Sequence, residues 1–183
     1  MDSKKIKSFM QLAGQKLGTK IDDSTPELRQ LGAQLLLSET LEYVIKGLGV
    51  IPEFNGTPIT DANALNYSAK NPADKLEMLD GLSDVAYTMY WNSEAFGLKL
   101  EDAFEAVCDN NLEKFVKLDS WTENSRPLQR EEWDCKKSIN WPPEVVTVEV
   151  IKVDSSHYAV GKDKNGKVRK PSSYKSVDLS THL

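Results

Sequence analysis

Two short acidic segments of the chain have the residue types and the spacing of a metal-binding site. Glu39 and Glu42 are three residues apart in an apolar stretch, and residues three or four apart share one face of a helix. Glu77, Asp80 and Asp84 share a face in the same way within a second apolar stretch. Carboxylates placed inward among apolar side chains are costly unless a positive charge compensates them. We therefore expect these acids to face inward and to hold a hard divalent cation, which takes oxygen ligands.

The ligand types narrow the choice of metal. The chain has two histidines, His157 and His182, and neither lies near the acidic segments. Di-iron bundles use Glu-x-x-His pairs, and zinc prefers His or Cys, whereas an all-oxygen site suits Mg²⁺ or Mn²⁺. A magnesium site in a helical bundle points toward phosphate chemistry. The alternative for each acidic segment is an ordinary solvated helix face.

The elements that must position these acids are mostly helices. Thr25 and Pro26 follow Ser24 as a helix start, and Gly47 and Gly97 are stop signals. A long irregular connection rich in Pro, Gly and Asn occupies residues 50–72. The predicted helices cover residues 3–17, 25–46, 71–96 and 100–117.

The last third of the chain has a different pattern. Strands are predicted at 146–151 and 158–160, and an Asn-Gly turn signal lies within 163–167. The sequence thus predicts an all-α protein, a four-helix bundle with a small C-terminal β-hairpin. We expect a helical catalytic domain over 1–118 and an irregular tail over 119–183, packed on the same domain.

Composition excludes some classes of function. The chain has 183 residues and a formal net charge of -5, so it lacks the basic balance typical of nucleic-acid-binding proteins. No apolar stretch approaches the roughly 20 residues of a membrane span. Cys108 and Cys135 have no metal-ligand spacing and fit a reducing, cytoplasmic setting. We expect neither a nucleic acid nor a membrane as a partner.

Two further groups of residues could bind phosphate. Asn111 and Lys114 lie one turn apart near the end of the fourth predicted helix; the alternative is a Lys that complements the helix dipole. A basic tail could reach phosphates as a flap of point charges, or it could be solvated. Its cationic residues are Lys162, Lys164, Lys167, Arg169, Lys170 and Lys175.

Several segments together resemble one enzyme family, the MazG-like all-α nucleoside triphosphate pyrophosphohydrolases, in the branch similar to phosphoribosyl-ATP pyrophosphohydrolase. The resemblance covers about two thirds of the chain, and the order and spacing of the segments are more specific than any one of them. The segments are 9–15, 35–42, 80–87, 95–98, 111–114 and 166–171, with Tyr174 and Asp178-Leu179 after them.

The resemblance implies a reaction and an assembly. Family members use Mg²⁺ or Mn²⁺ to hydrolyse a nucleotide between its α and β phosphates, and they are dimers or dimer-based tetramers. A phage subset, the MazZ type acting on guanine nucleotides, has a similar tail. The expected substrate is therefore a (deoxy)nucleoside triphosphate, with dGTP or GTP as one candidate and the host cytoplasm as the setting if a phage encodes the chain.

The resemblance also assigns roles to residues. Glu39, Glu42 and Asp84 fall on metal-ligand positions, and Asn111 and Lys114 on positions that handle phosphates. Ser38 and Gly81 stand where the family often has acids, so Asp80 or Glu77 is expected to supply a missing carboxylate. The expected substrate-binding residues of the tail are Lys167, Lys170 and Tyr174.

The identity of the general base stays open between Glu39 and Glu77, either of which would take a proton from the attacking water. Two other readings of the function also stay open. One is a pyrophosphatase of the same fold directed to dUTP or dCTP. The other is a non-catalytic helical oligomer whose acids form salt bridges across an interface. Because Tyr43, Val44, Tyr87, Tyr90 and Trp91 are hard to bury together in one bundle, we expect a homodimer or homotetramer joined through these helices.

Overall fold

The structure is a computed structural model that describes residues 3–18, 25–61 and 64–183. The chain forms two compact units, and α3 (Lys75–Phe96) runs from one into the other. We call Gly18–Asp84 the α2 unit, and Met1–Leu17 with Val85–Leu183 the sheet unit. This is a different division from the expected domains 1–118 and 119–183, which stay a prediction.

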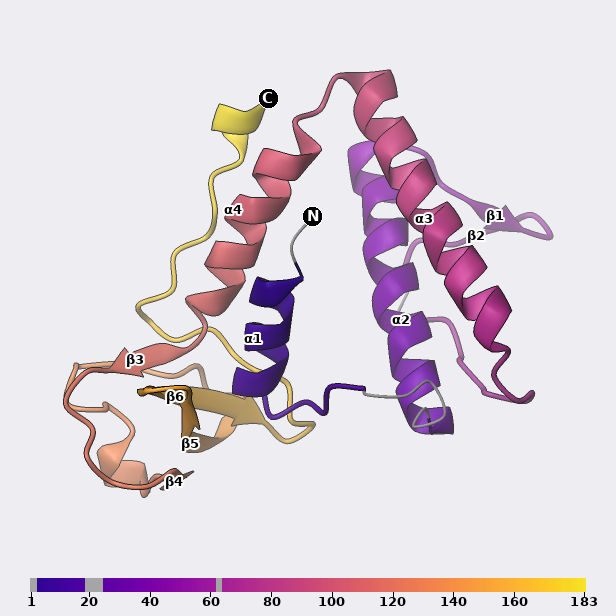
Figure 1. Ribbon diagram of the computed structural model, residues 1–183. Helices are drawn as coiled ribbons and strands as arrows, with labels where there is room; N and C mark the ends of the chain where they lie inside the picture. Colours follow the sequence, from indigo (N-terminus) through magenta and orange to yellow (C-terminus); the bar gives the residue numbers. More distant parts are fainter. Residues whose placement is uncertain (1–2, 19–24, 62–63) are drawn as a thin grey trace. The chain divides into compact units, whose positions relative to one another are not determined.

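The α2 unit is built on one helix and a short hairpin (Figure 1). Helix α2 (Pro26–Glu42) begins where the Thr25 hydroxyl accepts a hydrogen bond from the Leu28 N–H at 3.2 Å; Ser24, the first residue of the predicted helix start, lies outside the described residues. The helix continues as a π-helical turn, η2 (Tyr43–Gly47). Strands β1 (Glu53–Phe54) and β2 (Thr57–Pro58) then pair as an antiparallel hairpin.

Helix α3 ends at the predicted residue but begins four residues later than the predicted 71–96. The Asp74 carboxylate accepts hydrogen bonds from the N–H groups of Leu76 and Glu77 at 2.9 and 3.2 Å, which caps the helix. Gly97 follows the helix with φ of 67°, a left-handed conformation that favours glycine at a helix C-terminus. Helix α4 (Leu100–Leu112) comes next and is shorter than predicted.

The sheet unit is organised around a four-stranded antiparallel sheet in the order β3-β6-β5-β4. The central strands β5 (Val145–Val153) and β6 (Ser156–Asp163) form a hairpin where strands were predicted. Strand β3 (Val116–Leu118) pairs with β6, and β4 (Arg126–Pro127) pairs with β5. Short 3₁₀ helices η4 (Arg130–Glu132) and η5 (Ser180–His182) complete the unit.

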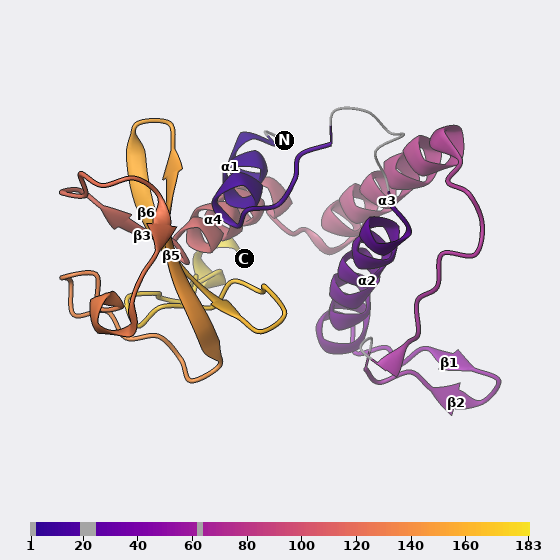
Figure 2. The same cartoon turned by 90° about the horizontal axis from the view of Figure 1, so that it is seen from below.

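One face of the sheet is covered by helices. Figure 2 shows α1 (Lys4–Leu12) and α4 together on this side. Leu12, Phe115 and Val160 are buried there, and Phe9 meets Phe115 edge-on with ring centroids 5.2 Å apart. Lys5 forms ion pairs with Glu105 and Asp109, which joins α1 to α4 at the surface.

The other face is covered by residues 121–141, a segment without a clear period in the sequence. Trp121, Trp133 and Trp141 pack there against buried Val148 and Val150. The Trp141 indole N–H donates to the Trp133 carbonyl at 2.9 Å. Gly161 is required beneath Trp141, since a Cβ added at Gly161 would lie 2.7 Å from Cζ3 of the indole and closer still to Cε3.

The predicted all-α four-helix bundle is therefore wrong, because the described residues combine four α-helices with two sheets. Residues 116–118 were expected in the fourth helix but form β3. Val116 and Leu118 alternate with Lys117 and pair with β6, far along the chain, which outweighs the local helical tendency. Strands as short as β3 and β4 carry too few residues for a recognisable alternation. Within the described part of the chain, no helix is both long enough and apolar enough to cross a membrane.

Candidate functional site

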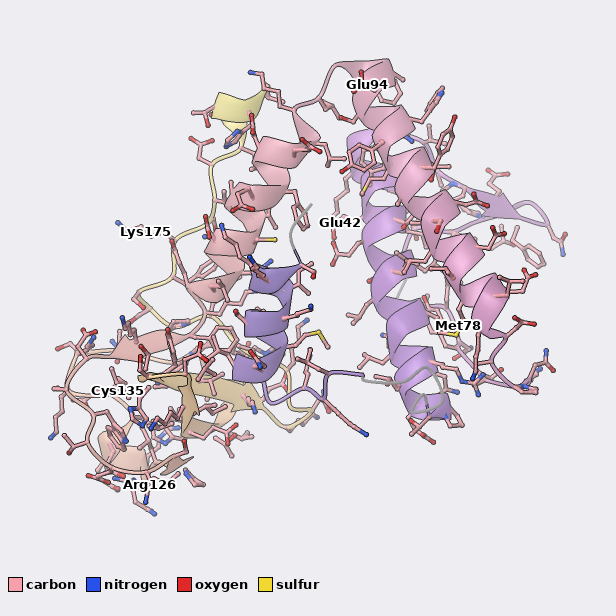
Figure 3. All side chains as sticks on the ribbon, in the orientation of Figure 1. Glu42, Met78, Glu94, Arg126, Cys135 and Lys175 are labelled. Carbon is pink, nitrogen blue, oxygen red and sulfur yellow. The ribbon has the colours of Figure 1, made fainter. Side chains whose placement is uncertain are left out.

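The acids predicted to bind metal all lie in the α2 unit. Glu39 and Glu42 are exposed on α2. Glu42, labelled in Figure 3, accepts a hydrogen bond from the Lys46 ammonium at 2.7 Å, one turn further on. Glu42 also directly precedes the π-helical turn, and π-helical insertions are frequent at functional sites.

The acids of α3 continue the same pattern. Glu77 lies in the first turn, and Asp80 and Asp84 follow at intervals of three and four residues. All three are exposed, and their spacing gives them a common helix face. Each helix thus presents carboxylates to solvent as a stripe.

The prediction that these acids face inward is wrong for a single chain. The leucines expected to enclose them are themselves exposed: Leu35 is 54% exposed and Leu79 is 66% exposed. The physical reason is that α2 and the first turns of α3 have little of their own unit packed over them. The apolar flanks correctly indicated a surface that needs covering, but the rest of the α2 unit does not cover it.

The donor set fits a hard divalent cation by its chemistry, since every candidate ligand is a carboxylate. In the described ranges 3–18, 25–61 and 64–183, no three His, Cys, Asp or Glu side chains stand close enough together to hold a metal ion. The metal assignment of Glu39, Glu42, Asp80 and Asp84 therefore stays a prediction.

The residues predicted to bind phosphate lie in the sheet unit, and two of them are in contact. The Lys114 ammonium donates to the Asn111 side-chain oxygen at 2.6 Å. It also lies 5.6 Å from the centre of the Phe9 ring. Asn111 is in the last turn of α4, and Lys114 is in the turn after it.

The tail residues Lys170 and Tyr174 form a second contact pair. The Lys170 ammonium lies 4.5 Å from the centre of the Tyr174 ring. The Tyr174 hydroxyl donates a hydrogen bond to the side-chain oxygen of Asn110 in α4. Asn110 thus connects the tail to the helix turn that carries Asn111. The sequence signal for Asn110, an amide beside a predicted site residue, was too weak to single it out.

The remaining basic residues of the tail have different roles. Lys162 forms an ion pair with Glu149 across the hairpin, and Arg169 pairs with buried Asp163 at 2.6 Å. Burial acts to raise the pKa of Asp163, but hydrogen bonds from two backbone N–H groups and from Arg169 outweigh it and lower that pKa. Lys162 and Arg169 therefore stabilise the fold, whereas Lys167, in the turn after β6, is exposed.

A cavity of about 570 Å³ lies between the end of α4, β3 and the tail. Lys117, Lys137 and Lys175 line it, together with Ser173 and Glu113. The Lys137 ammonium is held in place by the Lys117 carbonyl at 2.6 Å and the Asp119 carboxylate at 3.2 Å. Even with Glu113 in the lining and Asp119 paired to Lys137, the three lysines leave the cavity a net positive charge, which favours an anionic ligand.

The two cysteines do not supply a nucleophile. Burial is the largest cause of the raised pKa of Cys108. It is also the largest cause that raises the pKa of Cys135 to about 11. Both thiols are therefore protonated at neutral pH, and a thiol is a poor nucleophile and metal ligand.

No family model matches the chain, and neither does any curated protein or solved structure.

Proposed function

We propose that this protein is a nucleoside triphosphate pyrophosphohydrolase of the MazG-like type. It uses Mg²⁺ or Mn²⁺ to convert a (deoxy)nucleoside triphosphate into the monophosphate and pyrophosphate. One observation carries the proposal. Four of the residues expected to bind phosphate meet at the end of α4. Asn111 and Lys114 are in contact there, and Asn110 holds Tyr174, over which Lys170 lies. Asn110 and Tyr174 are 64 positions apart in the sequence.

The cationic cavity beside that helix end supports the same reading. Lys117, Lys137 and Lys175 bring positive charge to its wall in a protein whose formal net charge is -5. A local concentration of ammonium groups on an acidic protein suits a polyanion such as a triphosphate.

The acidic helices supply the metal ligands of the proposed reaction. Glu39, Glu42, Asp80 and Asp84 would hold the divalent ions, and Glu39 or Glu77 would take the proton of the attacking water. When bound, the ions supply Lewis-acid polarisation of the α-phosphate and balance the charge on the departing pyrophosphate. Asn111, Lys114, Lys167, Lys170 and Tyr174 orient the nucleotide so that water reaches the α-phosphorus.

Exposed apolar side chains on α2 and α3 support a homo-oligomer. Leu28, Leu31 and Leu35 recur at intervals of three and four residues, and each is at least 45% exposed. That spacing places them on one face of α2, in line with Glu42. Because contiguous exposed apolar patches mark interaction surfaces, we propose that these helices pair with a second copy in an isologous dimer or a dimer of dimers. The same feature favours the alternative of a non-catalytic helical oligomer.

A substrate screen separates these functions. The protein is incubated with each common ribo- and deoxyribonucleoside triphosphate and Mg²⁺, and pyrophosphate is measured. We expect release from at least one deoxynucleotide, with dGTP as the first candidate and dUTP and dCTP as alternatives of the same fold. Activity should vanish in excess chelator. Pyrophosphate release from none of the nucleotides, by a protein that is oligomeric, would favour the non-catalytic alternative.

A further inference from the structure

A buried amide holds the tail against the end of α4. Asn110 is only 8% exposed, and both polar atoms of its side-chain amide form hydrogen bonds with the tail. Its oxygen accepts from the Tyr174 hydroxyl, and its nitrogen donates to the Lys175 carbonyl. An asparagine left with neither bond at such a site would bury an unsatisfied donor and an unsatisfied acceptor, which destabilises the folded state.

A second tie holds the same segment one turn earlier. The Ser172 N–H donates to the Asn140 carbonyl at 2.8 Å, and the Ser172 hydroxyl accepts from the Asn140 N–H at 2.9 Å. Pro171, directly before Ser172, is buried. The segment 171–175 is therefore fixed at two points, and the Asn110 contact is the one that reaches α4.

Two cations belong to this part of the tail: Lys175 lies within the segment, and Lys170 directly precedes it. Lys170 lies over the ring of Tyr174, and Lys175 lines the 570 Å³ cavity. Asn110 holds the Tyr174 hydroxyl and the Lys175 carbonyl. Its amide therefore affects the position of the Lys175 ammonium directly, and that of the Lys170 ammonium through the Tyr174 ring. Its chain neighbour Asn111 holds Lys114 at 2.6 Å.

We propose that Asn110 is a positioning residue for the polyphosphate of the nucleotide. Its side-chain amide anchors Tyr174 and Lys175 to α4, and so presents Lys170 and Lys175 together with the Asn111–Lys114 pair. This inference rests on the proposed function. It names the contact that pre-orders the residues expected to bind the phosphates. An amide is needed because only it offers a donor and an acceptor at once, whereas a carboxylate at this position would lose the donor.

Three variants test this positioning role. Tyr174→Phe removes the hydroxyl but keeps the ring beneath Lys170, Asn110→Ala removes both anchoring bonds, and the double variant combines them. Tyr158→Phe is the matched control, since Tyr158 in β6 also carries a hydroxyl in the sheet unit and takes no part in the Asn110 contacts. For each protein we would measure the Kd for inorganic tripolyphosphate, KM and kcat for the best nucleotide, and hydrogen exchange of residues 171–178.

We expect Tyr174→Phe and Asn110→Ala to raise the tripolyphosphate Kd and the KM by about tenfold, the size of one lost hydrogen bond with its rearrangement. We expect kcat to change by less than about twofold, hydrogen exchange of 171–178 to accelerate, and the control to match the wild type. The double variant should be no worse than Asn110→Ala, because both changes break one linkage.

Other outcomes overturn the inference. Faster exchange with an unchanged Kd would make the anchor purely structural, and additive losses in the double variant would show two independent effects. If Asn110→Ala fails to fold, Tyr174→Phe still tests the inference, because that variant keeps the ring and loses only the hydroxyl. A wild-type protein that binds tripolyphosphate as described yet hydrolyses no nucleotide would sink the proposed function and leave the anchor standing.

Discussion

The two compact units differ in how fully each covers its own apolar side chains. The sheet unit has two hydrophobic clusters, one on each face of its sheet, with Val148, Val150 and Val160 almost fully buried. Among the described residues of the α2 unit, Leu41 is the one apolar side chain that is buried. The sheet and the segments that cover its two faces thus have the features of a self-sufficient fold. The α2 unit, like the part of α3 that carries Tyr87 and Trp91, leaves large apolar side chains exposed.

This difference bears on how a catalytic site would be assembled. The phosphate-binding candidates lie in the self-sufficient unit and are already held by specific hydrogen bonds, such as Lys114 to Asn111. The acids lie in the unit with uncovered leucines and are exposed. We therefore expect substrate contacts to be pre-organised in one chain, and the metal ligands to be organised fully only when α2 and α3 are covered.

The largest expected effect concerns the acids of the α2 unit. Glu42→Gln and Asp84→Asn should each lower pyrophosphate release on the order of 100-fold or more, because each removes a charged ligand of the divalent ions that would polarise the α-phosphate. Since both residues are exposed, the free energy of unfolding should change by less than about 0.5 kcal/mol.

The control for this prediction is Glu94→Gln, an exposed acid near the end of α3 that has no role in the proposed site (Figure 3). Turnover of Glu94→Gln should match the wild type. If Glu42→Gln and Asp84→Asn also keep near-normal rates, the acidic stripes are solvated surface and not ligands.

The packing of the sheet unit is tested by Gly161→Ala. The added methyl group would meet the Trp141 indole well inside van der Waals contact, so the variant should lose about 3 kcal/mol of stability through overpacking. Chemical denaturation measures this loss. Gly32→Ala in α2 is the comparison, because a Cβ there meets nothing within 4 Å and should stabilise the helix by about 0.5–1 kcal/mol. Equal effects of the two substitutions would contradict the contrast between the units.

The features of the fold that could be predicted are those that depend on residues close together in the sequence. The starts and stops of α2 and α3, and the hairpin of β5 and β6, follow from local signals such as Thr25, Asp74 and Gly97. The pairing of Val116 with Ala159, and the position of Trp141 over Gly161, depend on residues distant in sequence that have no local signature. The helix was therefore extended through residue 117, and the tryptophan-rich segment was read as irregular.

The site was predictable in part for the same reason. The basic character of the tail selected Lys170, and the family resemblance alone selected Tyr174; the structure links both to α4. It does so through Asn110, whose importance arises from a contact 64 residues away and not from its neighbours. For the acids, an apolar context predicted burial, but one sequence does not distinguish burial within a chain from burial between chains.

The exposed face of α2 is tested by introducing charge. Leu28→Glu with Leu35→Glu should weaken self-association by about 100-fold or more, because carboxylates without partners would be buried in the expected interface. Sedimentation at micromolar concentration measures the change. Leu183→Glu, at an exposed apolar residue of the sheet unit, should leave assembly unchanged. A wild-type protein that is monomeric at that concentration would refute the shared interface.

Lowering the pH is expected to have a smaller effect, on the stability of the sheet unit. The Glu132 carboxylate accepts hydrogen bonds from Arg126 and from the Gln129 N–H, and these lower its pKa from the ordinary 4.5 to about 2. A carboxyl group with a lowered pKa stabilises the folded state above its unfolded pKa and loses that contribution as the pH falls toward the folded one. The sheet unit should therefore lose stability between about pH 4.5 and pH 2. Glu132→Gln should flatten this dependence in acid denaturation, and an unchanged slope would remove Glu132 as its source.

Hydrolysis in ¹⁸O-labelled water tests the proposed chemistry most directly. The wild-type protein is incubated with Mg²⁺ and each common nucleoside triphosphate, and the products are identified by mass spectrometry. We predict pyrophosphate and a nucleoside monophosphate in equal amounts, with one ¹⁸O in the monophosphate, because water attacks the α-phosphorus. Label in the pyrophosphate, release of orthophosphate in its place, or no turnover of any nucleotide would contradict the proposal.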